Sequence, residues 1–352
     1  MKNEAVATRR KEILKGKTRE ELEAFARALG LEPYRGRQLF HWIYNKNAAG
    51  FEEMTTLKKA VREKLAEKAR LDLLKMEQVF RSAAEPTLKF LFRLPDGHMV
   101  EAVYMEEADR RTICVSSQVG CALACDFCAT GKMGFKRNLT AGEMVDQVLQ
   151  VHRYVGRKAT NIVVMGMGEP FLNYDEVIKA ASLLADPEGI AISKRKITIS
   201  TSGIVPAIRR FTAEGQRFKL AVSLNATTDE IRCRLMPIAK KYPLPELLAA
   251  VKEYTRRAPY RVTFEYVLME GVNDTPEDAR RLRRFLAHIP CKINLIPYNP
   301  VVSAYRASSE ERVSRFAQEL ATFSAPVTVR RSKGQDIRAA CGQLYTERSR
   351  KG

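Results

Sequence analysis

The chain concentrates possible metal ligands in the stretch CVSSQVGCALACDFC, which begins at Cys114 and holds four of the seven cysteines. Cys121, Cys125 and Cys128 have the spacing C-x3-C-x2-C, so one loop can present three thiolates to a common centre. Structural zinc and ordinary iron–sulfur clusters take four protein ligands. Two alternatives follow. Either Cys114 or a histidine completes a zinc site, or a [4Fe–4S] cluster keeps one iron free for a substrate or cofactor.

Two further segments carry residues with chemical potential. In MGMGEP, residues 165–170, glycines follow an apolar run and let the backbone approach a ligand closely. Glu169 in this segment can accept a cationic amino group. Cys341 stands in KGQDIRAACGQL, where small neighbours leave its thiol open to a ligand. Cys233 and Cys291, by contrast, are expected to pack as small buried hydrophobes.

The elements that must position these residues alternate from about residue 110 onward. Seven apolar runs predict strands: TICVSSQ from Thr112, NIVVMG from Asn161, KITIST from Lys196, FKLAVSL from Phe218, RVTFEYVL from Arg261, KINLIP from Lys292 and PVTVRRS from Pro326. Helical patterns such as AGEMVDQVLQVHRYV separate them. This alternation, without a Rossmann glycine fingerprint, predicts a parallel sheet in a full or partial (β/α) barrel. The unusual residues follow strand ends, which form the active-site face of such barrels.

The chain divides into a helical accessory domain, a β-rich connection, the barrel and a basic tail, at residues 1–70, 71–109, 110–345 and 346–352. In the first part, Thr18 and Glu21 have the spacing of a capping box. In the second, residues 95–97 are a hairpin signal. The expected fold class is α/β: a partial or nearly closed parallel barrel with a small helical N-terminal domain and a β-hairpin extension.

Composition points to a polyanionic partner. The formal net charge is +19, from 60 Lys and Arg against 41 Asp and Glu, which favours nucleic acid over a merely solvated basic surface. The basic clusters include residues 194–196 and the run around Arg330. No apolar run is long enough for a membrane helix and no secretory signal is present, so we expect a cytoplasmic protein without a membrane partner. In that reducing compartment, seven cysteines argue against a disulfide framework.

Several motifs carry a resemblance to a known family. The C-x3-C-x-aromatic-C run, with Phe127 as the aromatic residue, resembles the signature of radical S-adenosylmethionine (SAM) enzymes. Together with it, the segments GMGEP, ITISTSGIVPAI, KINLIPYNP and DIRAACGQL resemble the RlmN/Cfr family of adenosine-methylating radical SAM enzymes. GRQLFHWIY resembles the helix-hairpin-helix-like N-terminal domain of that family. The resemblance covers roughly residues 15 to 345.

The resemblance implies a cofactor site. Cys121, Cys125 and Cys128 would hold a [4Fe–4S] cluster, and SAM would bind the iron that lacks a protein ligand. The implied SAM contacts are Gly168, Glu169, Ser200, Ser223, Leu224, Asn225 and Asn299. Asn225 stands where the family often has a histidine, and the segment PVVSAYRASSEER after Asn299 departs from the family's usual sequence.

The resemblance also implies roles for the remaining cysteines. One SAM would methylate Cys341, and a deoxyadenosyl radical from a second SAM would take hydrogen from that methyl group. The carbon would then join the adenine ring, Glu101 would remove the ring proton, and Cys114 would attack the sulfur of Cys341 to release the RNA. The two cysteines must then lie within disulfide reach. A closed or nearly closed barrel would bring the first and seventh strands together.

The implied substrate is an adenosine of bacterial 23S rRNA, methylated at carbon 2, together with the adenosine 3′ of the tRNA anticodon. The implied electron donor is a protein such as flavodoxin, and we expect a monomer. Two alternatives stay open: methylation of carbon 8, as in the Cfr branch, and a non-catalytic RNA-binding protein with a structural zinc.

Overall fold

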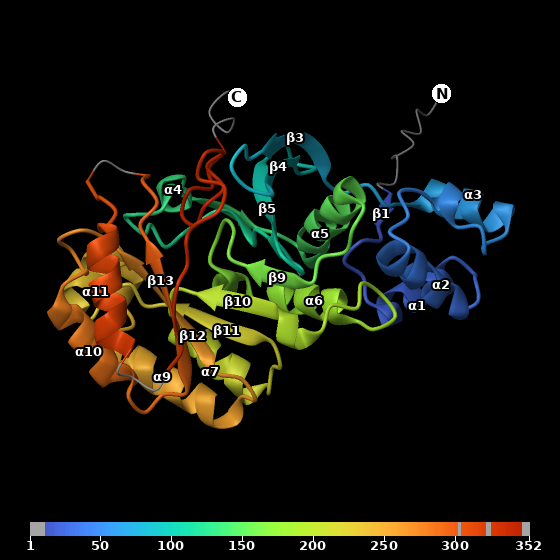
Figure 1. The fold of residues 1–352 in the computed structure, drawn as a ribbon. Helices are drawn as coiled ribbons and strands as arrows, with labels where there is room; N and C mark the ends of the chain where they lie inside the picture. The colour runs from blue at the N-terminus through green and yellow to red at the C-terminus, as the bar shows by residue number, and fades with distance from the viewer. Residues whose placement is uncertain (1–10, 302–303, 322–324, 347–352) are drawn as a thin grey trace, which may run out of the picture.

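The computed structural model describes residues 11–301, 304–321 and 325–346 (Figure 1). Its parallel strands are β6 (Arg110–Cys114), β9 (Asn161–Val164), β10 (Ile197–Thr201), β11 (Lys219–Ser223), β12 (Val262–Leu268), β13 (Cys291–Pro297) and β14 (Val327–Val329). Three more strands extend the same sheet: β3 (Lys75–Arg81), β4 (Thr87–Arg93) and β5 (Met99–Glu107). The order across this ten-stranded sheet is β14-β13-β12-β11-β10-β9-β6-β5-β4-β3.

The parallel part confirms the predicted alternation of strands and helices. Each of the seven predicted runs forms a strand, and each strand pairs in parallel with the next one along the chain. The helices between them are α5 (Ala141–Val155), α6 (Tyr174–Ala185), α7 (Val205–Ala213), α8 (Asp229–Leu235), α9 (Leu244–Arg257), α10 (Pro276–Leu286) and α11 (Glu310–Ala321). Within the described residues, no helix has the length and apolar character needed to cross a membrane.

The barrel is partial. β6 pairs on one side with β9 and on the other with β5, and β14 stands at the opposite edge of the sheet. In the described part of the chain β14 therefore does not pair with β6, and no hydrogen-bonded closure joins the first and seventh strands. The predicted hairpin joins β4 to β5, where Gly97 adopts φ +86° and its N–H donates to the carbonyl of Leu94 at 2.9 Å.

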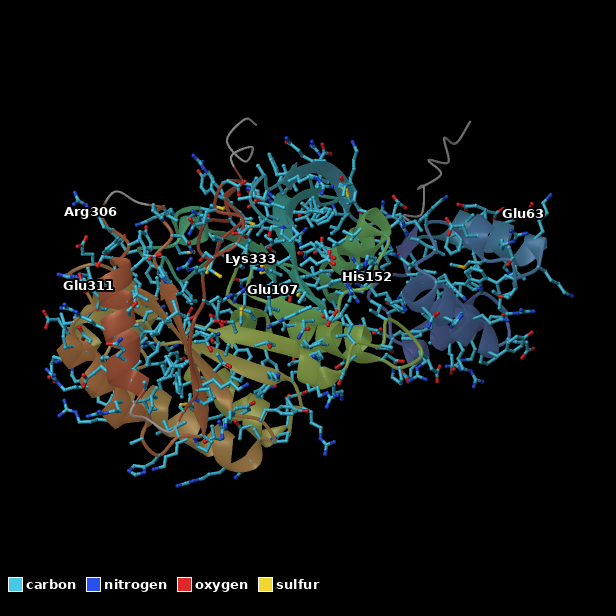
Figure 2. All side chains as sticks on the ribbon, in the orientation of Figure 1. Glu63, Glu107, His152, Arg306, Glu311 and Lys333 are labelled. Atoms are coloured by element: carbon cyan, nitrogen blue, oxygen red, sulfur yellow. The ribbon has the colours of Figure 1, made fainter. Side chains whose placement is uncertain are left out.

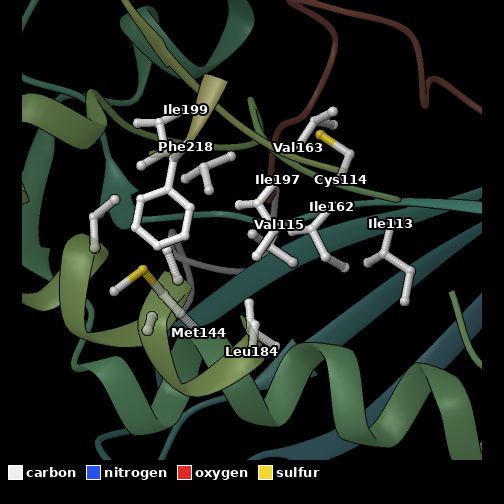
Figure 3. Packing of buried hydrophobic residues seen from close by; sticks show 14 of the residues in the cluster. Ile113, Cys114, Val115, Met144, Ile162, Val163, Leu184, Ile197, Ile199 and Phe218 are labelled. Atoms are coloured by element: carbon white, nitrogen blue, oxygen red, sulfur yellow. The ribbon is translucent and has the colours of Figure 1, made fainter. Parts of the chain in front are cut away.

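The core lies between the sheet and the helices that cover it. Ile113, Ile162 and Ile197 come from three neighbouring strands and are fully buried. Figure 3 shows them packed with Met144 of α5 and Leu184 of α6. Because β-branched side chains pack well on a pleated surface, these runs form strands rather than helices. The core holds the strands in place, so that their carboxyl ends can carry the site.

A small helical module precedes the sheet in the chain, shown in blue in Figure 1. Its elements are β1 (Glu12–Ile13), α1 (Arg19–Ala28), α2 (Tyr34–Phe40), a π-helical turn (His41–Asn45), α3 (Lys59–Lys68) and β2 (Ala69–Arg70). The predicted capping box begins α1: the N–H of Glu21 donates to Thr18 Oγ1 at 3.3 Å, and the N–H of Thr18 donates to Glu21 Oε2 at 2.7 Å.

A buried ion pair joins this module to the sheet domain. Lys15 Nζ lies 2.5 Å from Asp146 Oδ1, and both side chains are almost fully buried. Asp146 Oδ2 also accepts hydrogen bonds from the N–H of Leu74 at 2.9 Å and from Gln150 Nε2 at 3.1 Å. The Asp146 carboxylate on α5 thus connects Lys15 of the helical module to Leu74, which follows the module.

We expect Lys15→Met to destabilise the protein by about 3–5 kcal/mol, because it leaves a buried carboxylate without its counter-charge. Denaturant unfolding of the full chain measures this change. Asp146→Asn keeps an acceptor for Leu74, so the double variant Lys15→Met/Asp146→Asn should lose less stability than the sum of the single variants. Additive losses would show that the two charges do not stabilise each other.

Candidate active site

A cavity opens at the carboxyl ends of the parallel strands, with a volume of about 980 Å³ that includes space open to solvent. The predicted residues that line it are Cys121, Cys125, Cys128, Gly168, Glu169, Ser200, Ser223, Asn225, Asn299 and Cys341. They come from the ends of successive strands and from residues 330–346, called here the C-terminal segment. The fold therefore brings most of the predicted site to one place.

The three clustered cysteines lie on one returning loop. It runs from β7 (Gln118–Gly120) to α4 (Ala129–Lys132), and β7 pairs antiparallel with β8 (Phe135–Asn138). Ala124, between the first two cysteines, has a φ of 49°, a left-handed conformation that tightens the turn. All three cysteines consequently line the same cavity.

The electrostatics of this loop suit a cationic ligand. Burial raises the pKa of Cys121 to about 12, and burial with the neighbouring thiols raises that of Cys125 well above its usual value. Thiols in such surroundings stay protonated unless positive charge is supplied, as a bound metal does. Among the described residues, no three His, Cys, Asp or Glu side chains form a site for a single metal ion. A [4Fe–4S] cluster instead takes one thiolate on each of three irons, which this loop can provide.

Backbone donors hold Glu169 beside the cysteine loop. Its Oε1 accepts from the N–H of Phe171 at 3.0 Å, and its Oε2 accepts from the N–H of Ser202 at 2.8 Å. Gly168 adopts φ +104°, and a Cβ there would lie 2.6 Å from Gln118 Cβ, so a larger residue would not fit. Burial raises the pKa of Glu169, and the N–H of Ser202 opposes that effect. A cationic amino group in the cavity would stabilise this carboxylate.

Polar side chains from the next strands complete the cavity wall. Ser200 and Ser223 lie near the ends of β10 and β11 and line the cavity. Asn225 is buried with φ 58°, a left-handed conformation that asparagine tolerates well. Its Oδ1 accepts from the N–H of Val267 at 2.9 Å. The amide of Asn225 therefore ties β11 to β12 as well as facing the cavity.

Leu224 is the one predicted cofactor contact that the structure does not bring to the cavity. Its side chain is fully buried, because successive side chains of a strand point to opposite faces and its neighbour Ser223 faces the cavity. Its N–H donates to the carbonyl of Glu265 at 2.9 Å, and its carbonyl accepts from Arg232 Nε at 3.2 Å. Leu224 contributes to the core and to the pairing of neighbouring segments.

Asn299 holds the backbone of Cys341. Asn299 Nδ2 donates to the carbonyl of Cys341 at 3.0 Å, and Asn299 Oδ1 accepts from Gln335 Nε2 at 2.9 Å. The carbonyl of Gly342 accepts from the N–H of Ala129 at 2.8 Å, directly after the last cysteine of the loop. These bonds connect the C-terminal segment to the cysteine loop and place Cys341 at the cavity.

Cys114 and Cys341 line a second cavity of about 720 Å³, which also includes open space. Cys114 ends β6, and the C-terminal segment brings Cys341 to it after crossing from the far edge of the sheet. Lys333 of this segment pairs with Glu107 of β5 at 3.4 Å, and Figure 2 labels the two close together. Both thiols are free. The expectation that the ends of the first and seventh strands lie near each other is confirmed, because Arg330, directly after β14, lines the same cavity as Cys114 at the end of β6. The C-terminal segment then places Cys341 in that cavity.

Arg330 is a cation beside both thiols. Cys341, Glu265 and Cys114 raise the pKa of its guanidinium, with Cys341 the strongest of the three. Burial raises the pKa of Cys114 to about 12, while Arg330 lowers it. From the sequence, Arg330 was predicted to belong to a basic cluster, and Glu265 was not predicted as a site residue. The available signal for Glu265 was a carboxylate in the middle of the apolar strand β12.

Glu101, the predicted base, is buried on β5 and lines neither of these cavities. Its carboxylate lies 3.0 Å from Lys89 Nζ and accepts from the N–H of Tyr345 at 2.9 Å. Burial raises the pKa of Glu101, and Lys89 opposes that effect. In this arrangement Glu101 anchors the C-terminal segment.

The two remaining cysteines lie outside the site. Cys291 begins β13 and is 2% exposed, as predicted for a core residue. Cys233 on α8 is only partly buried, so the prediction of full burial was wrong there. Neither residue lines the two cavities.

Comparisons with known proteins agree with this arrangement. The model of the radical SAM superfamily matches residues 115–286, and that of the ribosomal RNA large subunit methyltransferase N-terminal domain matches residues 13–71. A probable dual-specificity RNA methyltransferase RlmN of Symbiobacterium thermophilum is 47% identical, over 96% of this chain and 92% of the relative. The RlmN of Geobacter sulfurreducens is 48% identical, over 94% of this chain and 91% of the relative.

A solved structure is similar over almost the whole length. The crystal structure of a radical SAM methyltransferase from Sphaerobacter thermophilus superimposes with a TM-score of 0.91 at 47% identity, covering 95% of this chain and 99% of that one. A radical SAM enzyme of this kind uses a [4Fe–4S] cluster and SAM, for which the cysteine loop and Glu169 have the necessary donors. The chain belongs to the RlmN family of radical SAM RNA methyltransferases.

Proposed function

We propose that this enzyme methylates carbon 2 of an adenosine in 23S rRNA and of the adenosine 3′ of the tRNA anticodon. The observation that carries the proposal is the position of Cys341, which lines both the cavity of the cysteine loop and the cavity of Cys114. A thiol shared by the two cavities can receive a methyl group on one side and deliver its carbon to a base on the other. The relatives' name, dual-specificity RNA methyltransferase, supports two RNA substrates.

The residues of the first cavity bind and orient the cofactors. Cys121, Cys125 and Cys128 would hold the [4Fe–4S] cluster, and Glu169 would receive the amino group of SAM. When bound, these groups would supply a methyl group and a radical that abstracts hydrogen. Cys341 would give its thiol proton to solvent, and its thiolate sulfur would take the methyl group while the donor leaves as a neutral thioether. Asn299 keeps this sulfur in place through its bond to the Cys341 carbonyl, 3.0 Å in length.

Cys114 releases the product. Once the methyl carbon is bonded to the adenine ring, the RNA is attached to the protein through the sulfur of Cys341. The Cys114 thiolate attacks that sulfur, the sulfur–carbon bond breaks, and its electron pair stays on the carbon, which takes a proton to become a methyl group. The two sulfurs form a disulfide, which an external thiol reduces. Arg330 supports this step because a cation beside Cys114 favours its thiolate.

Glu101 is the proposed base that removes the ring proton from carbon 2. A base must be ionised, and burial works against ionisation of this carboxyl. Lys89, 3.0 Å away, restores the ionised form. Lys89 is therefore needed for the proton transfer although it does not accept the proton.

We assign residues 1–70 to a helical accessory domain, of which residues 1–10 lie outside the described residues. Residues 71–109 form a connection, residues 110–345 the catalytic barrel, and residues 346–352 a basic tail of which only Thr346 is described. The enzyme acts as a cytoplasmic monomer and takes electrons from a protein such as flavodoxin. Carbon 8 is not favoured as the target, because the curated relatives at 46–49% identity carry the RlmN name. A non-catalytic zinc protein does not agree with membership of an enzyme family.

Protein isolated from cells should carry a methyl group on Cys341. Mass spectrometry of the tryptic peptide AACGQLYTER should find it heavier by one methyl group, with the mass assigned to the cysteine. The same peptide from Cys341→Ala protein serves as the control. An unmodified Cys341 in protein whose cluster still cleaves SAM would contradict the methyl-carrier role.

We expect Cys114→Ala to stop turnover after the carbon has joined the base, since nothing then attacks the sulfur of Cys341. Covalent protein–RNA adducts should accumulate on denaturing gels and disappear after nuclease treatment. Cys233→Ala, which removes a thiol outside both cavities, is the matched control and should turn over normally. If the Cys114→Ala variant released free methylated RNA at the normal rate, Cys114 would not be the residue that attacks the sulfur of Cys341.

Lys89→Met should shift the pH profile of RNA methylation. Lys89 lowers the pKa of Glu101, so its removal raises that pKa further. The reaction needs the ionised carboxylate, so the acidic limb of the rate profile should move to higher pH. Lys89→Arg keeps the charge and should keep the limb in place. An acidic limb that is identical in all three proteins would remove Glu101 from the mechanism.

A further inference from the structure

A regular pattern of basic residues lies at the opposite end of the barrel from the cavity. Three parallel strands carry a Lys or Arg four positions before a residue that lines one of the two cavities. The pairs are Arg110 and Cys114 on β6, Lys219 and Ser223 on β11, and Lys292 and Ile296 on β13. Side chains four apart on a strand point to the same face, so these three cations face the same interior as the site residues. Lys196 lies directly before β10, four positions before Ser200.

The side chains confirm that these cations converge. Lys219 interacts with Lys292, Lys196 and Arg110, and also with the neighbouring Arg195. Burial is the main cause that lowers the pKa of Lys219, and the neighbouring cations lower it further. We call Arg110, Lys196, Lys219 and Lys292 the basal cation cluster.

The cluster is open to solvent at its outer end. Lys219 is half-buried, and the other three members are exposed. Arg110 Nε donates to Thr112 Oγ1 at 3.2 Å, which places its side chain below the interior of the barrel. Four residues of extended strand span about 13 Å, so the cluster is well separated from the cofactor cavity.

The basal cation cluster has no acidic partner among the residues that the structure describes. Exposed arginines elsewhere on the chain do pair with acids: Arg210 with Asp175 at 2.5 Å, Arg280 with Glu277 at 3.0 Å, and Arg315 with Glu311 at 2.5 Å. Like charges placed together without counter-charges repel each other and oppose folding. An arrangement of this kind suits a surface that binds a polyanion.

We propose that the basal cation cluster binds the phosphate backbone of rRNA outside the loop that carries the target adenosine. The inference rests on the proposed rRNA substrate and adds a second contact surface to it. Phosphates are the anions that four convergent Lys and Arg side chains neutralise, and such contacts carry no sequence preference. A target loop in the cavity does not reach the opposite end of the strands, so flanking RNA occupies the cluster.

The test compares three triple variants of the full chain. Arg110→Gln/Lys196→Gln/Lys292→Gln removes three cations of the cluster and leaves the half-buried Lys219. Arg210→Gln/Arg280→Gln/Arg315→Gln removes the same charge from paired, exposed positions. Arg110→Lys/Lys196→Arg/Lys292→Arg keeps the charge of the cluster. Thermal unfolding checks that all three fold.

Binding is measured with a long 23S rRNA fragment and with the isolated target hairpin, over a range of salt concentrations. The neutralised cluster should bind the long fragment on the order of tenfold more weakly, and the slope of log affinity against log salt should fall by about 2. Binding of the hairpin should be unchanged. The paired-arginine variant and the charge-keeping variant should bind both RNAs like the original protein.

Three outcomes would overturn the proposal. The cluster variant could bind the long fragment like the paired-arginine control, or it could lose hairpin binding to the same extent. It could also bind RNA normally while an acidic electron-donor protein reduces the iron–sulfur cluster of the variant more slowly. That result would assign the basal surface to a protein partner. Because binding is measured without turnover, failure of the methylation chemistry itself is recognised separately, by the absence of methylated adenosine.

Discussion

The anchoring of the C-terminal segment across an open barrel is the constraint on which the site depends. The sheet does not close, so hydrogen bonding between strands does not by itself fix Cys341 beside Cys114. Hydrogen bonds to buried partners replace closure. Asn299 binds the Cys341 carbonyl at one point, and Glu101 binds the N–H of Tyr345 at another. Buried polar groups are costly without partners, so each of these bonds favours one path for the segment over the alternatives.

This arrangement gives several side chains two tasks. Asn299 lines the cofactor cavity and also fixes the methyl-carrying residue. Glu101 is the proposed base and also an anchor of the C-terminal segment. Asn225 lines the cofactor cavity and also joins β11 to β12 through Val267. Because binding residues also hold the structure, loss of activity after substitution at these positions needs a measurement of folding beside it.

Charge is distributed along the barrel axis. One end holds thiols and the buried carboxyl groups of Glu169 and Glu265, where burial opposes ionisation and bound cations are favoured. The other end holds convergent cations such as Lys219. The first end is therefore suited to a cationic sulfonium cofactor and a metal cluster, and the second to phosphates. The helical module, anchored by the buried pair of Lys15 and Asp146, lies beside the sheet (Figure 1).

The sequence by itself determined the elements and the chemistry. Apolar runs and their spacing predicted all seven parallel strands, and the cysteine spacing with GMGEP predicted the cofactor loop, because these signals are local. Only the tertiary structure decided that the barrel stays open, that Leu224 faces the core, and that Arg330 lies beside Cys341. These features depend on contacts between segments far apart in the chain. Such contacts form only as distant segments come together during folding. No local pattern of residues therefore predicts them.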